Sequence, residues 1–333
     1  MDVMQFTQAL SRIWVLETRL LDKTKVERML EANSADEVLK ILGETEYANI
    51  MGSIKRAADY EEILSTELKR VYKLVYELCP VKEIVDLMST KYKYHNIKVL
   101  LKGKFLEKDL SNMLIDLGRE DLNELKRKID TDNFRDLKGN VEKAVLEVIA
   151  DFEANKDPQK IDIIVDRYMF KELDEIKKSL NYKFTDKLVN AMIDSTNVRT
   201  LLRVKKQGKG REFASEVLVT GGAISKDTLV AIINETPENI ISKLSTSIYS
   251  DLIKEGVESY IATNSANLLE KLSDNYIMDL MKSGKLVTFG PERILSYIYA
   301  KETEIKIIRI IMVGKLNNIT EEVIRERLRD IYV

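Results

Sequence analysis

A pair of glycines is the feature of this sequence that most resembles a site for chemistry. It lies in the stretch VLVTGGAIS, from Val217 to Ser225. A dinucleotide-binding turn has glycines at the first, third and sixth positions of GxGxxG, which let the backbone approach a pyrophosphate. Here Gly221 is followed directly by Gly222, and the sixth position is Lys226. The sequence also contains no GxxxxGK[ST] motif, so it predicts no nucleotide cofactor and no direct nucleotide hydrolysis.

Histidine and cysteine are too rare for most metal or nucleophile chemistry. The sequence has one cysteine, Cys79, and one histidine, His95. Metal sites that need two imidazoles or a Cys/His cluster are therefore excluded, and so is an internal disulfide. His95 lies at the start of a repeated phrase whose second copy has Thr196 at the same place, which favours a helix-start residue over a catalytic base. We expect no catalytic residues and no small-molecule substrate.

Basic side chains on apolar helices are the remaining candidates for a binding site. They form three pairs with i,i+4 or i,i+3 spacing, so each pair projects from one helix face. The pairs are Lys98 with Lys102, Arg199 with Arg203, and Lys306 with Arg309. The three faces could line a common centre that meets an acidic partner, or they could be solvated edges of ordinary amphipathic helices. Both interpretations stay open at the sequence level.

A denser basic cluster follows the second pair in RVKKQGKGR, from Arg203 to Arg211. We interpret it as the last turn of a helix, where Lys and Arg interact favourably with the negative helix end. The whole chain has 53 Lys and Arg against 55 Asp and Glu, which gives a net charge of −2. This balance gives no electrostatic reason to propose a nucleic-acid partner.

The composition favours helices throughout. The 333 residues include only 13 Gly and 4 Pro, with 32% charged and 44% hydrophobic residues, so we expect an all-α protein with a substantial core. Asp157 and Thr236 each precede a proline and predict helix N-caps, with Pro at the first helical position. No stretch approaches the roughly 18 apolar residues of a membrane-spanning helix, so we expect a soluble chain.

One helical phrase occurs three times at intervals of about 100 residues, which predicts an internal repeat. The copies are NIKVLLKGK from Asn96, NVRTLLRVK from Asn197, and EIKIIRIIMVGK from Glu304, and SRIWVLETRLL from Ser11 is a weaker echo. A polar loop and a second helix follow each phrase. In this register VTGGAIS is a loop between two helices, and Ser225 begins the next helix. The repeat predicts three similar helical modules, at 1–108, 109–212 and 213–333.

The order of these phrases resembles that of a known family. The closing stretch FGPERILSYIYAKETEIKIIRIIMVGKLNNITEEVIRERLRDIYV, from Phe289 to Val333, resembles the C-terminus of the C subunit of prokaryotic A-type/V-type ATP synthases, which is related to the eukaryotic vacuolar ATPase d subunit. The stretch that begins SRIWVLETRLL, together with YHNIKVLLKGK and STNVRTLLRVKKQGKGREFASEVLVTGGAIS, resembles the same family in the same order. The resemblance runs from about Ser11 to Val333 and rests on the length and order of the matches.

Membership of that family implies a funnel of three helical modules around a pseudo-threefold axis. The implied role is a non-catalytic socket in the central stalk, between the D and F subunits of the rotor shaft and the membrane proteolipid ring. The chain would then lie at the cytoplasmic face of the membrane and would need no cofactor. No family motif fixes contact residues, so the three basic pairs stay our candidates for partner binding. The alternative from the residues alone is a helical-repeat scaffold that binds another protein or RNA.

Overall fold

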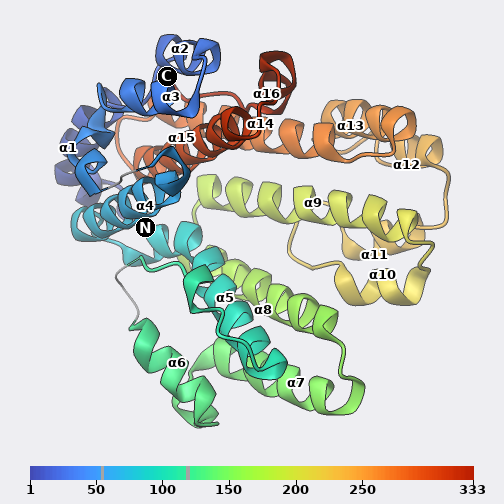
Figure 1. Ribbon diagram of the computed structural model, residues 1–333. Coiled ribbons are helices and arrows are strands. Elements are labelled where there is room, and N and C mark those ends of the chain that lie inside the picture. Colours follow the sequence, from blue (N-terminus) through green and yellow to red (C-terminus); the bar gives the residue numbers. More distant parts are fainter. Residues whose placement is uncertain (54–55, 118–120) are drawn as a thin grey trace. The chain divides into compact units, whose positions relative to one another are not determined.

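The computed structural model describes residues 1–53, 56–117 and 121–333 and is shown in Figure 1. All regular elements in these ranges are helices, which confirms the all-α prediction. The α-helices are α1 (Thr7–Glu17), α2 (Lys23–Glu31), α3 (Ala35–Leu42), α4 (Tyr60–Leu78), α5 (Lys82–Leu106), α6 (Leu122–Asp130), α7 (Gly139–Asn155), α8 (Pro158–Leu180), α9 (Lys183–Lys206), α10 (Arg211–Val217), α11 (Lys226–Ala231), α12 (Pro237–Lys243), α13 (Ser250–Thr263), α14 (Asn267–Ser283), α15 (Glu292–Leu316) and α16 (Glu321–Arg327). Short 3₁₀ helices lie at Met4–Phe6, Glu46–Asn49, Met51–Ser53, Ala57–Asp59, Ser111–Met113, Phe134–Asp136 and Gly284–Leu286.

Two of the helix starts follow the predicted capping chemistry. The Asp157 carboxylate accepts a hydrogen bond from the backbone N–H of Gln159 at 2.9 Å, at the start of α8. The Thr236 hydroxyl accepts one from the N–H of Asn239 at 3.3 Å, at the start of α12. In both helices proline is the first residue, where its missing N–H costs no hydrogen bond. These two predictions are confirmed.

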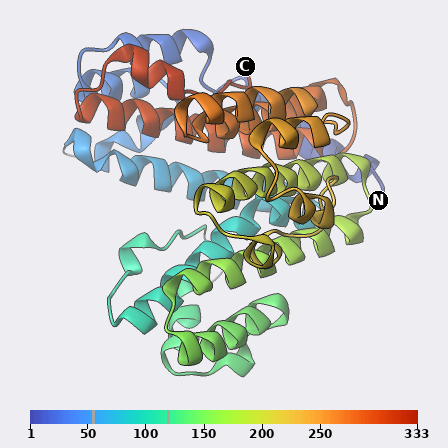
Figure 2. The same ribbon diagram turned by 90° about the vertical axis from the view of Figure 1, so that its right-hand side faces the viewer.

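The chain divides into two compact units. The middle unit consists of Ser89–Ser273 together with Met1, and the terminal unit consists of Asp2–Met88 and Asp274–Val333. In the middle unit α8 packs against α7 and α9, and Figure 2 shows α9 running along α8. The core there includes Tyr94, Ile97, Leu101, Val145 and Ile161, each at most 1% exposed.

The terminal unit combines both ends of the sequence. Helix α15 packs against α1 and α4, so a C-terminal helix shares its core with N-terminal ones. Buried residues occur along nearly the whole of α15, from Glu292 to Gly314. No helix in the described part of the chain combines the length and the apolar character that crossing a membrane requires.

Candidate functional site

The glycine pair lies in a loop between α10 and α11, as predicted. Asp194 of α9 accepts hydrogen bonds from the backbone N–H groups of Ala223, at 2.8 Å, and Ile224, at 3.1 Å. A Cβ added at Gly222 would lie 2.1 Å from the Asp194 Oδ1, so only glycine allows this approach. The loop thus holds an anion, but the anion is the chain's own carboxylate. Burial raises the pKa of Asp194, and the two N–H groups oppose that rise.

The single histidine and the single cysteine make structural contacts. The His95 Nε2 lies 2.9 Å from the carbonyl oxygen of Met113, to which it donates as the N–H tautomer. The Cys79 thiol is buried and donates to the Val81 carbonyl at 3.1 Å. Burial raises the pKa of this thiol to about 11, which suppresses the reactive thiolate. The described residues hold no group of three or more His, Cys, Asp or Glu side chains that could bind a metal ion.

The first basic pair is neutralised within the middle unit. The Lys98 Nζ lies 2.8 Å from Asp166 and the Lys102 Nζ lies 2.7 Å from Asp162, and both acids belong to α8. The sequence analysis identified the two lysines but not the acids. Their partners lie at least sixty residues away along the chain, so only the packing of α5 on α8 brings them together.

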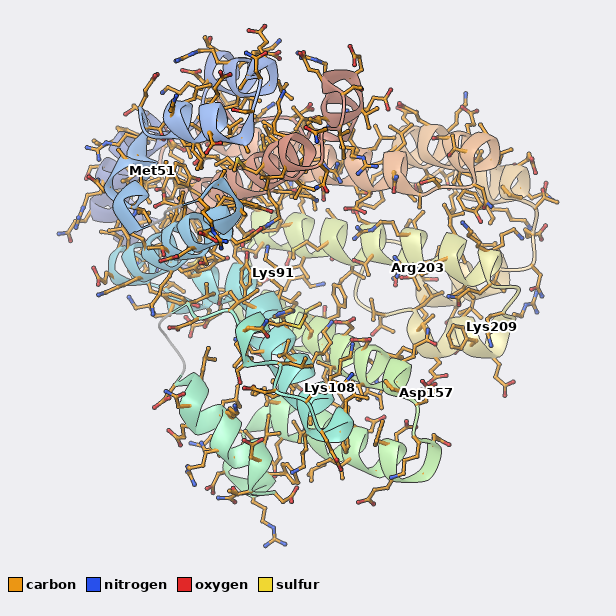
Figure 3. The ribbon with its side chains drawn as sticks, in the orientation of Figure 1. Met51, Lys91, Lys108, Asp157, Arg203 and Lys209 are labelled. Atoms are coloured by element: carbon orange, nitrogen blue, oxygen red, sulfur yellow. The ribbon has the colours of Figure 1, made fainter. Side chains whose placement is uncertain are left out.

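The second basic pair keeps its charge. The Arg199 Nε donates to the Ser195 carbonyl of its own helix at 3.2 Å, and Arg203 is exposed. Figure 3 labels Arg203 on α9 and Lys209 just beyond the end of that helix. Within the described ranges neither arginine forms an ion pair with a carboxylate. This face of α9 is therefore more basic than the faces that carry Lys98 and Lys102.

The third basic pair lies in the terminal unit, and both of its members are paired. The Lys306 Nζ lies 2.5 Å from Asp274, which Arg329 also contacts at 2.8 Å. Burial would raise the pKa of Asp274, but the charges and hydrogen bonds of Lys306 and Arg329 outweigh it and hold the pKa below its usual value. Arg309 forms an exposed pair with Glu61 of α4 at 2.6 Å. The third pair therefore also holds helices together.

Two asparagines, which sequence reasoning did not single out, hold loops in the same way. The Asn96 side chain donates to the carbonyl of Ile115 and accepts from its N–H, both at 2.8 Å. The Asn197 side chain makes the same two bonds with Val219, both at 2.9 Å. Each asparagine is the first residue of its copy of the repeated phrase, so the repeat in sequence is also a repeat of hydrogen bonding. We call these contacts the asparagine clamps.

The third copy of the phrase makes an analogous contact to the N-terminal segment. Its first residue, Glu304, accepts a hydrogen bond from the backbone N–H of Leu21 at 2.6 Å. Leu21 lies just before α2, much as Ile115 and Val219 lie before α6 and α11. The last residue of SRIWVLETRLL is therefore bound to the first residue of the third phrase. The sequence showed SRIWVLETRLL only as a weaker echo of the phrase and did not predict this contact.

A lysine near the end of each phrase binds the carbonyl end of a short helix. Lys104 donates to the Ile129 carbonyl of α6 at 2.9 Å, Lys205 to the Ile233 carbonyl after α11 at 3.4 Å, and Lys315 to the Leu30 carbonyl of α2 at 2.5 Å. Cations are favourable there because the last carbonyls of a helix carry partial negative charge. Lys206 and Arg211 similarly donate to the carbonyls of Asn264 and Ala231. The basic cluster thus binds the ends of neighbouring helices, where we expected only an interaction with its own helix.

A buried charge cluster in the terminal unit is the largest feature that the sequence did not reveal. The Lys301 Nζ is completely buried and lies 3.0 Å from Glu67 and 2.8 Å from Glu304. Arg70 adds a second cation 2.7 Å from Glu67, and the Tyr47 hydroxyl donates to Glu304 at 2.7 Å. The cluster joins α15, α4 and the 3₁₀ helix Glu46–Asn49.

The protonation states in this cluster follow from the balance of burial and pairing. Burial alone would lower the pKa of Lys301, but Glu304 and Glu67 outweigh it and raise that pKa above its ordinary value. Burial would raise the pKa of Glu67, but Arg70 and Lys301 hold it below its usual range. Lys301, Glu67 and Arg70 are therefore charged at neutral pH, and the cluster is a structural ion-pair network.

Within the described ranges, several charged side chains form ion pairs with other helices of the same unit, an arrangement that fits a rigid structural protein. A family model described as "ATP synthase (C/AC39) subunit" matches residues 9–327. The chain belongs to this family. Its members are non-catalytic stalk subunits of rotary ATPases, so this chain is a non-catalytic subunit of a V-type or A-type ATPase complex.

Individual relatives agree over almost the full length. The chain is 31% identical over 319 residues to the C subunit of the V-type sodium ATPase of Enterococcus hirae, covering 95% of both chains. It is 24% identical over 351 residues to the C subunit of the A-type ATP synthase of Methanocaldococcus jannaschii, covering 98% of this chain and 87% of the other. It is also 22% identical to the corresponding A-type ATP synthase protein of Pyrococcus furiosus, covering 96% of this chain and 88% of the other.

Proposed function

We propose that this chain connects the soluble rotor shaft, formed by the D and F subunits, to the membrane proteolipid ring. It would lie at the cytoplasmic face of the membrane and couple ATP synthesis or hydrolysis to ion transport. The observation that carries the proposal is the coverage of the match, because 95% of this chain aligns with 95% of its Enterococcus hirae relative. Because the alignment covers almost all of both chains, the regions that would contact the shaft and the ring in the relative have counterparts in this chain.

Torque transmission requires a part that is stiff and does no chemistry. Loops would yield under load, but the asparagine clamps tie two of them to long helices through paired hydrogen bonds. The buried cluster around Lys301 fixes α15 against α4 in the terminal unit. These contacts support a rigid transmitting role within each unit.

We propose that three similar modules, 1–108, 109–212 and 213–333, surround a pseudo-threefold axis. The recurring clamp positions support this arrangement, since Asn96, Asn197 and Glu304 each lie two residues before a member of the basic pairs. We also keep the proposal that the three basic pairs contact an acidic part of the shaft. Arg199 and Arg203 are its strongest members, because the other four side chains already have a carboxylate partner.

Deletion of the gene in the host organism tests the proposed function. Membranes without this chain should lose ATP-driven ion pumping, while the detached soluble head should still hydrolyse ATP. Re-expression of the chain should restore pumping and should co-purify the shaft and ring subunits. Pumping at the normal rate without the chain would contradict the socket role and favour a scaffold that binds another protein or RNA.

A further inference from the structure

A polar cavity of about 410 Å³ lies in the middle unit, away from the three basic pairs. Its walls come from α7, α8 and the loop that carries the glycine pair, and its lining residues are Glu147, Arg167, Tyr168, Phe170, Lys171, Val219 and Thr220. The Asn197 clamp and the Asp194 hydrogen bonds hold that loop. The part of the cavity wall that this loop forms is therefore anchored to α9 by hydrogen bonds.

Cations outnumber acids around this cavity. Arg167 and Lys171 are four residues apart on α8, so both project from one face, and both lie over the Tyr168 ring, at 5.5 and 5.7 Å from its centroid. Glu147 is the one carboxylate in the lining and is already bound by Arg167 and by the Tyr168 hydroxyl. Within the described ranges Lys171 has no ion pair, so its charge faces the cavity uncompensated.

A third cation, Lys226, lies outside the lining of the cavity but close enough to Arg167 for the two charges to repel. Lys226 is half-buried at the start of α11, six residues after Thr220 of the cavity wall. Burial lowers the pKa of Lys226, and the charge of Arg167 lowers it further, while Asp227 opposes both. Because Arg167 is already paired with Glu147, Lys171 and Lys226 are the cations that an added anion would neutralise.

The choice of anion follows from the donors that remain. The backbone N–H groups of Ala223 and Ile224, which could have formed a phosphate cradle, are already bound to Asp194. What remains is a set of side-chain cations beside the apolar faces of Tyr168 and Phe170. Guanidinium and ammonium groups beside an aromatic wall suit a carboxylate side chain with its aliphatic stem.

We propose that this cavity, with Arg167, Lys171 and Lys226, binds an acidic protein segment through its Asp and Glu side chains. The source of the segment rests on the proposed function, since another subunit of the complex would supply it. The chemistry of the site does not, because the isolated chain should bind any flexible acidic peptide of suitable length.

A glutamate hexapeptide is a direct probe of the site. Titration calorimetry with the full chain should detect binding that weakens as salt is added. Changing both Lys171→Glu and Lys226→Glu should weaken the affinity by about tenfold or more, since both charges that attract the peptide become repulsive. Both positions lie outside the clamps and the buried cluster, and circular dichroism checks that the variant is folded.

A matched control separates this site from general electrostatic attraction. Lys183→Glu with Lys187→Glu makes the same change in net charge on exposed positions of α9 and should leave the affinity within about twofold. Equal losses in the two double variants, or no loss in the first, would overturn the proposal. So would inorganic phosphate that binds as tightly as the peptide. Failure here leaves the gene-deletion result untouched, so the two proposals are tested separately.

Discussion

At the scale of single residues, several charged side chains of this protein hold its own helices together. Lys301 is the extreme case, because an ammonium group is excluded from water and kept charged by two carboxylates. A buried ion pair adds little net stability compared with an apolar pair, but removing one partner leaves the other charge buried and uncompensated. The cost of that removal is measurable.

Lys301→Met should lower the free energy of unfolding of the terminal unit by about 3–5 kcal/mol. The single tryptophan, Trp14, lies in α1 of that unit, so its fluorescence in a urea titration reports on it. Arg325→Met is the control, because Arg325 pairs with Glu27 at the surface and its loss should cost less than about 1 kcal/mol. A Lys301→Met variant as stable as the control would show that the cluster is not tightly packed around its cation.

The same cluster, together with the ion pairs of Asp274, predicts how stability depends on pH. The pKa values of Glu67 and Asp274 are lowered in the folded state, so the unfolded chain takes up protons at a higher pH than the folded one. Their contribution is complete above the ordinary carboxyl pKa, near 4.5 for Glu67, and is lost as the pH falls through the lowered values. The urea midpoint of Trp14 fluorescence should therefore fall between about pH 6 and pH 3.

Glu67→Gln isolates part of this dependence. The variant should be less stable at neutral pH, because Lys301 and Arg70 lose a charged partner, but its stability should change less on acidification. A parental midpoint that rises as the pH falls would have the wrong sign and would contradict the lowered pKa values.

At the scale of elements, the sequence predicted local chemistry better than contacts between helices. The caps at Asp157 and Thr236 and the loop before Ser225 depend on residues within a few positions, so pattern alone sufficed. The acids that neutralise Lys98 and Lys102 lie on another helix, and their register is set only by packing. The sequence therefore overestimated how many of these basic side chains are free to bind a partner.

The sequence shows the two asparagines of the clamps but not the hydrogen bonds that they form. Asn96 and Asn197 are the first letters of a repeated phrase, and an asparagine within a helix is normally interpreted as a weak helix former. Their function depends on a loop about twenty residues later that returns to the same helix. The recurrence of asparagine at the same position of two repeats was the feature of the sequence that could have indicated a shared structural role.

Asn197→Ala should release the glycine loop. The substitution leaves the N–H and the carbonyl of Val219 without partners in a buried place, at a cost of about 2–3 kcal/mol. Hydrogen exchange of the amides at 217–225 should become faster, while exchange in α7 should not change. Asn155→Ala is a suitable control, because the Asn155 side chain is exposed and bonds only within its own helix.

At the scale of the whole molecule, family membership supplies what the charge pattern could not. A net charge of −2 is compatible with many kinds of protein, and the match of the family model over residues 9–327 is what identifies a rotary ATPase subunit. The ion pairs in the structure then distinguish the six proposed contact residues from one another. Because Arg199 and Arg203 are the two of the six that lack carboxylate partners within the described ranges, any electrostatic attraction to a shaft should depend on them most.

This gives a graded prediction for shaft binding. Arg199→Glu with Arg203→Glu should slow association with the purified D and F subunits by about tenfold at low salt and make it less sensitive to added salt, because long-range attraction is lost. The charge swap Lys98→Asp with Asp166→Lys preserves the net charge of that pair and should leave association near the parental rate. Surface plasmon resonance at several salt concentrations measures both. If the swap slows association as much as the double arginine variant, shaft binding depends on the local geometry of α5 and not on the electrostatic potential of α9. If neither variant changes the rate, the basic pairs are solvated and structural edges, and the shaft is bound by another face of the chain.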